Sequence, residues 1–124
     1  MINLCALRQM IMDLHNVEDH LKVEVGVTFN EAAILCAIDN GYTEPAAIAK
    51  QMNLSPSRTS RLLTSVESKK LINRKNSRVD KRVVHISLSQ RGQKVLEQLH
   101  VCDAKFPAYI EEAIIKGTEN ANEQ

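Results

Sequence analysis

The segment from Ser55 to Thr64 combines two arginines with short hydroxyl side chains in a spacing that suits contact with a nucleic acid. Its Ser-Pro start is typical of a helix N-terminus, and helical spacing divides its side chains into two faces. The predicted inward face consists of Thr59, Leu62, Leu63 and Val66. Short hydroxyls let a helix approach a groove closely, and arginine binds guanine edges bidentately or reaches phosphate. The candidate contact residues are Ser55, Ser57, Arg58, Ser60, Arg61 and Thr64, with Ser65 on the same outward face.

A second group of basic residues follows in residues 72–88, where the apolar pattern changes to a period of two around the turn-prone segment Asn76–Asp80. This pattern predicts a two-stranded hairpin. An isolated hairpin is only marginally stable, so we expect it to lie against the helices as a wing. The candidate contact residues of the wing are Arg74, Lys75, Arg78, Lys81 and Arg82.

Asp80 is the one acidic residue in this basic hairpin. Its carboxylate would repel phosphate unless it is engaged elsewhere. We therefore predict that Asp80 accepts N–H groups of the turn and pairs with Arg82, which would hold the wing in shape. The alternative is a solvated aspartate in a turn.

The charge of the chain is strongly divided, although the formal net charge is only +1. Residues 50–94 carry 12 Lys and Arg against Glu67 and Asp80, whereas the remaining residues carry 4 basic and 13 acidic side chains. A concentrated basic region is typical of a protein that binds a phosphate backbone. Aromatic residues are few and Trp is absent, which argues against binding of single strands by base stacking.

Helices are predicted on both sides of the wing. Apolar residues at steps of three or four over residues 4–21 indicate a first helix of about five turns. Thr28 and Glu31 form a predicted capping box that opens a second helix, ending near Asn40. Residues 45–53 and 55–69 then predict a helix-turn-helix. Ser89 opens another helix, and residues 106–116 form a short last helix of about three turns. The polar tail from Gly117 is expected to fray.

The order of helices, helix-turn-helix and wing resembles the MarR (multiple-antibiotic-resistance regulator) family of bacterial transcription factors. The most specific likeness is Asp80-Lys81-Arg82, followed by the Leu-Ser-x-x-Gly of residues 88–92. One departure is Lys70, because the family usually has Gly after the recognition helix, where Gly tolerates a left-handed conformation. The chain is also short for the family, so the seam of a dimer is expected to be smaller or differently packed.

The resemblance implies a mainly α (α+β) fold, a winged helix-turn-helix with a two-stranded β wing and N- and C-terminal dimerisation helices. It implies one domain over residues 1–124, with a DNA-binding part over 28–92 and dimerisation helices over 1–25 and 89–116. The implied function is that of a repressor or activator that binds a pseudo-palindromic operator in double-stranded DNA as a homodimer. By the same likeness, a small-molecule effector would lodge between the dimer helices and the winged part. The apolar stripe of the first helix also favours packing on a second chain, although it could cover only its own domain.

Two other interpretations remain open. The basic face could meet an acidic protein partner, which would make the chain a winged-helix module for protein assembly. Alternatively, a thiol or metal trigger could control the same DNA-binding fold, with Cys5 beside Arg8 as the thiol. A buried and inert cysteine is the commoner case. The candidate metal-binding residues are His15, Asp19, His20, His100 and Cys102, but they lack the spacing of a known ligand motif, so we expect no metal and no cofactor.

Catalysis and membrane insertion are not predicted. No nucleophile with a base, no phosphate-binding Gly loop and no pair of carboxylates in a recognisable frame is present, so we do not expect an enzyme. Arg8, Asp13 and His15 interrupt the N-terminal apolar pattern, which predicts neither a signal peptide nor a membrane span. Three widely spaced cysteines without a CxxC motif fit a reducing compartment, so we expect a cytoplasmic protein.

Overall fold

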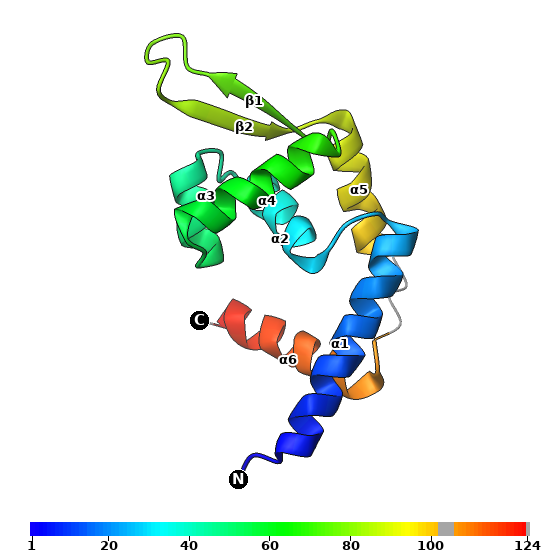
Figure 1. Ribbon diagram of the computed structural model, residues 1–124. Coiled ribbons are helices and arrows are strands. Elements are labelled where there is room, and N and C mark those ends of the chain that lie inside the picture. The colour runs from blue at the N-terminus through cyan, green and yellow to red at the C-terminus, as the bar shows by residue number, and fades with distance from the viewer. Residues whose placement is uncertain (102–105, 124) are drawn as a thin grey trace. The chain divides into compact units, whose positions relative to one another are not determined.

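The computed structural model describes residues 1–101 and 106–123, which contain six helices and a two-stranded antiparallel sheet (Figure 1). The elements are α1 (Leu4–Glu24), α2 (Phe29–Asp39), α3 (Pro45–Met52), α4 (Pro56–Ser68), β1 (Ile72–Asn76), β2 (Val84–Leu88), α5 (Gln90–Val101) and α6 (Ala108–Glu123). The predicted mainly α winged-helix class with a two-stranded wing is confirmed. The chain divides into two compact units, unit 1 with residues 1–26 and 103–124, and unit 2 with residues 27–102.

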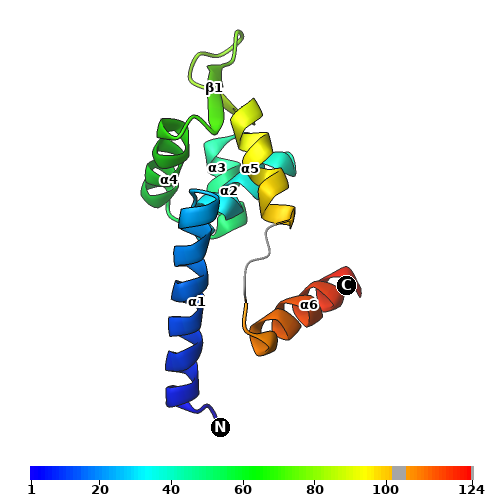
Figure 2. The same ribbon diagram turned by 90° about the vertical axis from the view of Figure 1, so that its right-hand side faces the viewer.

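Helix α2 lies at the centre of unit 2, where it contacts α3, α4, α5 and β2. The predicted capping box is present, because the Thr28 side chain accepts from the backbone N–H of Glu31 and the Glu31 side chain accepts from the N–H of Thr28. The core of the unit is fully buried, and its largest side chains are Ile34, Leu35, Ile48, Leu63 and Ile86. Figures 1 and 2 show the hairpin at one end of this helical unit.

The turn between α3 and α4 is short and fixed by backbone contacts. Asn53 ends α3 in a left-handed conformation with a φ of 53°, and the N–H of Leu54 donates to the carbonyl of Ala49 at 3.0 Å. Ser55 then caps α4 by accepting from the N–H of Arg58 at 3.2 Å, and Pro56 is the first residue of the helix. The predicted helix-turn-helix is confirmed, with both helix boundaries near the expected residues.

The hairpin pairs Ile72 with Leu88 at its base and Asn76 with Val84 near its tip. Ile72 and Ile86 are buried, whereas Lys75 and His85 lie exposed on the opposite face. The N–H of Ile86 donates to the carbonyl of Thr43 at 2.8 Å, which attaches the hairpin to the start of α3. The hairpin is therefore held against the helices, as we expected because an isolated hairpin is only marginally stable.

Lys70 occupies the left-handed conformation that the family usually gives to glycine, with a φ of 62°. The N–H of Lys70 donates to the carbonyl of Glu67 at 2.9 Å, and the N–H of Leu71 donates to that of Val66 at 3.0 Å. These two hydrogen bonds form the Schellman motif that ends many helices. The helix therefore ends with the usual cap, and Lys70 has the left-handed conformation that is strained for a residue with a β carbon.

Ser89 joins the end of α4 to the start of α5. Its hydroxyl donates to the carbonyl of Lys70 at 2.7 Å, and its N–H donates to the carbonyl of Leu71 at 3.0 Å. The same hydroxyl oxygen accepts from the N–H of Gly92 at 3.0 Å and so caps α5. The serine of the Leu-Ser-x-x-Gly motif thus connects two segments that are distant in sequence.

Unit 1 contains α1 and α6. Asn3 caps α1 by accepting from the N–H groups of Cys5 and Ala6, and the Tyr109 hydroxyl donates to the carboxylate of Asp13. The expectation that the last helix ends near residue 116 with a frayed tail is wrong, since α6 runs for 16 residues to Glu123. A single glycine costs a helix only about 1 kcal/mol, and the Thr118 hydroxyl continues the helix by donating to the carbonyl of Ile114 at 3.0 Å.

Helix α5 clusters with unit 2, although its residues were expected in the dimerisation part. Which helices join two chains stays a prediction. None of the described helices combines the length and the apolar character that crossing a membrane requires.

Candidate nucleic-acid interface

The outward face of α4 carries the predicted polar residues. Ser57, Arg58, Ser60, Arg61 and Thr64 are exposed, while Thr59, Leu63 and Val66 are buried and Leu62 is half-buried. Two local hydrogen bonds order this face, because the hydroxyls of Ser55 and Ser57 lie 3.3 Å apart and the Thr64 hydroxyl donates to the carbonyl of Ser60 at 2.9 Å. The exposed side chains of Arg58 and Arg61 belong to the same face.

Ser65 does not belong to this outward face, so its prediction is wrong. Its side chain is half-buried, and its hydroxyl donates to Oε2 of Glu31 at 2.7 Å. Helical spacing alone places Ser65 near the boundary of the two faces. A buried carboxylate on α2 supplies an acceptor there, which turns the hydroxyl inward.

Glu31 is the buried centre of a polar network that connects α2 to α4. Its side chain is only 2% exposed, and its Oε1 accepts from the N–H of Thr28 at 2.9 Å and from Nζ of Lys69 at 2.7 Å. Burial by itself would raise the pKa of Glu31, but the hydrogen bonds from Lys69, Ser65 and Thr28 and the Lys69 charge hold this pKa below the ordinary value of 4.5. The network fixes the C-terminal half of α4 against the helix that starts the unit.

The sequence did not reveal this function of Glu31. The capping box singled Glu31 out as part of a helix start only, and Ser65 and Lys69 lie 34 and 38 residues further on. No sequence pattern links residues at these separations.

Hollows lie beside α4 in the part of the chain that the structure describes. One, of about 280 Å³, is lined by Asn30, Leu54, Arg58, Arg61, Leu62 and Ser65. Another, of about 350 Å³, lies towards α3 and the hairpin, with Pro45, Ala49, Thr59, Leu63 and Arg74 among its lining residues. The outward arginines therefore stand at the rim of one hollow.

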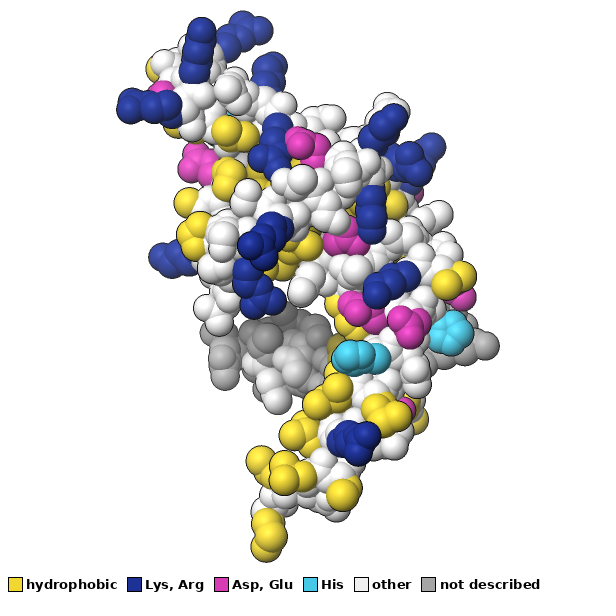
Figure 3. Space-filling view, in the orientation of Figure 1, with side chains coloured by type: hydrophobic (Ala, Val, Ile, Leu, Met, Phe, Trp, Pro, Cys, Tyr) yellow, Lys and Arg dark blue, Asp and Glu magenta, His cyan; other side chains and the backbone are white. Residues whose placement is uncertain are grey.

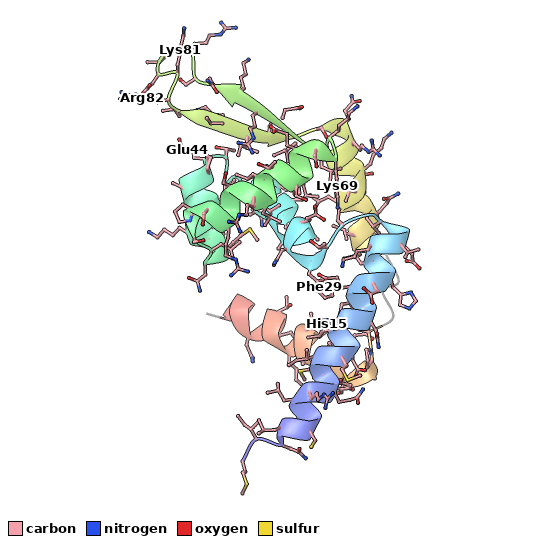
Figure 4. The ribbon with its side chains drawn as sticks, viewed as in Figure 1. His15, Phe29, Glu44, Lys69, Lys81 and Arg82 are labelled. Carbon is pink, nitrogen blue, oxygen red and sulfur yellow. The ribbon has the colours of Figure 1, made fainter. Side chains whose placement is uncertain are left out.

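The wing presents its cations at an ordered tip. Arg78, Lys81 and Arg82 are exposed around the turn, and Figure 4 shows Lys81 and Arg82 at the end of the hairpin. The Ser77 hydroxyl accepts from the N–H of Val79 at 3.2 Å and from that of Asp80 at 3.4 Å. The predicted Asp80 contact is present, because Oδ1 of Asp80 accepts from the N–H of Arg82 at 3.0 Å and from its Nε at 3.3 Å.

Arg74 differs from the other wing residues. Its Nε lies 2.7 Å from Oε2 of Glu67, so it joins β1 to the last turns of α4. Both side chains are partly exposed, 31% for Arg74 and 45% for Glu67. A phosphate contact by Arg74 would have to compete with this ion pair, whereas Lys75 on the opposite face of the strand is exposed.

The candidate metal-binding residues that the structure describes do not form a metal site. Cys5, His15, Asp19 and His20 are exposed along α1, and the described residues contain no group of three or more side chains that could hold a metal ion. Cys102 and the side chain of His100 lie outside the described residues. Burial, with a smaller contribution from Asp39, raises the pKa of the half-buried Cys36 thiol.

Residues 17–99 match the family model for the transcriptional regulator SarA/Rot. The chain belongs to the SarA/Rot family. The matched range contains α4 and the whole wing of this SarA/Rot protein, while α6 lies beyond it. No curated protein sequence matches the chain.

Solved structures show that this SarA/Rot chain has the MarR-type winged-helix fold, as predicted. Apo MarR from E. coli superposes with a TM-score of 0.70 at 17% identity, covering 98% of each chain. MepR from S. aureus, in a complex with DNA, gives a TM-score of 0.64 at 20% identity, covering 96% of this chain and 98% of MepR. YusO from Bacillus subtilis gives 0.66 at 20% identity, covering 96% of this chain and 89% of YusO.

Figure 3 shows how charge is distributed over one face of this SarA/Rot protein. Within unit 2, Lys and Arg side chains gather at the tip of the wing, on α4 and where α4 meets α5. The predicted contact residues of α4 and of the wing thus belong to one compact unit.

Proposed function

We propose that this chain is a sequence-specific regulator that binds double-stranded DNA through unit 2. The observation that carries the proposal is the face of α4, where exposed Arg58 and Arg61 stand among short hydroxyls beside an ordered basic wing. Such a helix fits a major groove, where side chains contact base edges. Membership in a family of transcriptional regulators and a fold shared with MepR, which was solved bound to DNA, support the same function.

Helix α4 and the wing make different kinds of contact with DNA in this proposal. Arg58 and Arg61 read base edges or reach phosphates, while Ser57, Ser60 and Thr64 allow close approach and bond the backbone. The wing residues Lys75, Arg78, Lys81 and Arg82 contact flanking phosphates, which adds affinity and fixes the register. Arg74 contributes through its ion pair with Glu67, which positions β1 against α4.

The regulator acts as a homodimer on a pseudo-palindromic operator. Support comes from unit 1, where large apolar side chains are exposed on α1 and α6. They include Leu4 at 74%, Leu7 at 45%, Ile11 at 47%, Met12 at 50%, Ile114 at 50% and Ile115 at 51%. Apolar surface of this kind is stabilised when another surface covers it, and a second copy supplies a complementary one. Two half-sites would then lie roughly 34 to 36 Å apart.

Binding of a small molecule releases this regulator from DNA in the proposed function. The proposed ligand site is the hollow of about 350 Å³ beside α4, which combines an apolar lining with the Arg74 guanidinium and lies within unit 2. It differs from the site between the dimer helices and the winged part that the family resemblance implies. A ligand in the hollow would act only by its differential affinity for the conformations that bind and release DNA.

Selection of bound fragments from the source genome tests the proposal. We expect fragments that share a two-fold symmetric motif, bound at least about 10³-fold more tightly than random duplexes. Sedimentation should give the mass of two chains. Equal affinity for selected and random DNA would contradict a specific regulator, and binding to an acidic protein in the absence of any DNA binding would favour the assembly module.

A further inference from the structure

We propose that a second basic surface of unit 2, the junction patch of Lys70, Arg91 and Lys94, binds phosphates of the duplex outside the site that α4 and the wing contact. This inference rests on the proposed function and extends it. In the sequence these residues belong to the same basic segment, residues 50–94, as the cations of α4 and the wing. In the structure they lie apart from the cations at the tip of the wing.

Backbone contacts build the junction patch. Ser89 bonds the carbonyls of Lys70 and Leu71, which holds the start of α5 against the end of α4. Arg91 follows Ser89 by two residues, and Lys94 lies three residues beyond Arg91 on the same helix face. In Figure 3, dark blue side chains gather where α4 ends and α5 begins, away from those at the wing tip.

The patch has no described anionic partner. Lys70, Arg91 and Lys94 are all exposed, and none of them forms an ion pair among the described residues. Two carboxylates near the end of α4 already have cationic partners, since Glu31 of α2 pairs with Lys69 and Glu67 of α4 pairs with Arg74. The positive charge of the patch is therefore directed to the outside.

The residue types in the patch favour a phosphate backbone over a protein surface as the partner. Protein interfaces concentrate their binding energy in apolar and aromatic anchors, but no large apolar side chain is exposed among residues 68–71 or 88–99. The exposed neighbours include Gln90 and Gln93, which donate hydrogen bonds. One exposed carboxylate, Glu97, lies three residues beyond Lys94, so the three cations of the patch still outnumber it. Cations and amides without an apolar anchor suit the repeating charge of a phosphate backbone.

The test compares duplexes of two lengths. A selected fragment is trimmed to about 20 base pairs, enough for two half-sites one helical turn apart, and is also prepared with random flanks on both sides. The variant is Arg91→Gln with Lys94→Gln. The matched control is Arg8→Gln with Lys116→Gln, which removes the same charge from exposed positions of unit 1. Thermal unfolding checks that every protein is folded.

For the wild type we expect tighter binding and a steeper salt dependence on the long duplex. The double variant should keep its affinity for the short duplex and lose about two units of salt slope on the long one, close to one per lost phosphate contact. The control should behave as the wild type on both. Equal salt slopes of the double variant and the wild type on the long duplex would overturn the junction patch while leaving the proposed function intact.

Two further outcomes have separate meanings. Binding of polyglutamate by the wild type but not by the double variant, with equal DNA binding, would overturn the proposal in favour of an acidic protein partner. Failure of the wild type to bind either duplex would overturn the proposed function and this inference together.

Discussion

A β carbon on Gly92 would lie 2.1 Å from the carbonyl oxygen of Leu71. That distance is far inside van der Waals contact, and the Leu71 atoms that the β carbon would meet belong to the backbone. The same carbonyl accepts the N–H of Ser89 at 3.0 Å, so the close approach and the hydrogen bond belong to one junction. The glycine of the Leu-Ser-x-x-Gly motif is thus required by the packing of α5 on the chain segment that leads from α4 into the wing.

Gly92→Ala should therefore destabilise the protein, because the start of α5 must move and the Ser89 bonds must stretch. We expect a loss of about 1–3 kcal/mol in the free energy of unfolding, the range of overpacking substitutions, measured by chemical denaturation. Gly117→Ala is the matched control. Its β carbon meets nothing within 4 Å, so it should stabilise α6 by up to about 1 kcal/mol. Equal effects of the two substitutions would contradict the close contact.

Lys70→Gly should stabilise the protein, which is the reverse of the usual effect of glycine. Lys70 has a φ of 62°, and glycine adopts this conformation without the cost of about 1 kcal/mol that a β carbon adds. Denaturation of Lys94→Gly, at an ordinary position of α5, serves for comparison and should show a loss of about 1 kcal/mol. A loss of stability in Lys70→Gly would mean that the Lys70 side chain contributes more than its backbone costs.

Glu31→Gln should lower stability at neutral pH by about 1–3 kcal/mol, because the buried network loses the negative charge and one of the two acceptor oxygens of Glu31. The pKa of Glu31 is below its ordinary value of 4.5 in the folded protein. The network therefore stabilises the fold fully above about pH 4.5 and loses this contribution as the pH falls through the lower folded pKa.

Unfolding free energies measured between pH 7 and pH 3 test this dependence. The difference between the wild type and Glu31→Gln should shrink as the pH falls below 4.5, the ordinary value of the group. Glu97→Gln, at an exposed position of α5, is the control and should leave stability almost unchanged at every pH. A difference that does not vary with pH would mean that the Glu31 carboxylate does not titrate with folding.

Asp80→Ala should weaken DNA binding although it removes a negative charge from a basic surface. The carboxylate holds the backbone N–H and Nε of Arg82, and a hydrogen bond of this kind contributes about 0.5–1.5 kcal/mol, so a loss of about two- to tenfold in affinity is expected. Asp80→Asn keeps an oxygen acceptor, so its affinity for DNA should lie between those of the wild type and Asp80→Ala. Fluorescence anisotropy with a selected duplex measures the change, and tighter binding by Asp80→Ala would disprove the shaping role.

Arg61→Ala and Lys75→Ala should weaken DNA binding in different ways. Loss of Arg61 should cost about 1–3 kcal/mol on a selected duplex and relax sequence preference, whereas loss of Lys75 should weaken all duplexes alike and reduce the salt slope by about one. Titrations of selected and random duplexes at several salt concentrations separate the two effects. An unchanged preference in Arg61→Ala would remove this residue from base reading.

Local signals in the sequence predicted most of the fold. The capping box at Thr28 and Glu31, the Ser-Pro start of α4 and the change of period after Ile72 each depend on residues a few positions apart, and each appears as expected. The last helix was predicted too short, because one glycine in a polar segment was taken as its end.

Contacts between distant segments could not be predicted. The inward turn of Ser65, the pairing of Arg74 with Glu67 and the approach of Gly92 to Leu71 depend on how helices and hairpin pack together. Periodicity gives the face of a helix to within one residue, and Ser65 lies at that boundary. Which group faces such a boundary residue, here Glu31 of α2, is determined only when the helices pack together.

The tip of the wing separates two properties that a DNA-binding loop needs. Its geometry depends on the Ser77 hydroxyl, the Asp80 carboxylate and the bond from the N–H of Val83 to the carbonyl of Asp80. Its charge depends on Arg78 and Lys81, whose side chains form none of the hydrogen bonds described for this turn. Arg82 takes part in both, but Arg78 and Lys81 contribute charge without taking part in the hydrogen bonds that shape the loop. Under the proposed function, a lineage can exchange these two cations, and so change how tightly the wing binds phosphates, while inheriting the same loop.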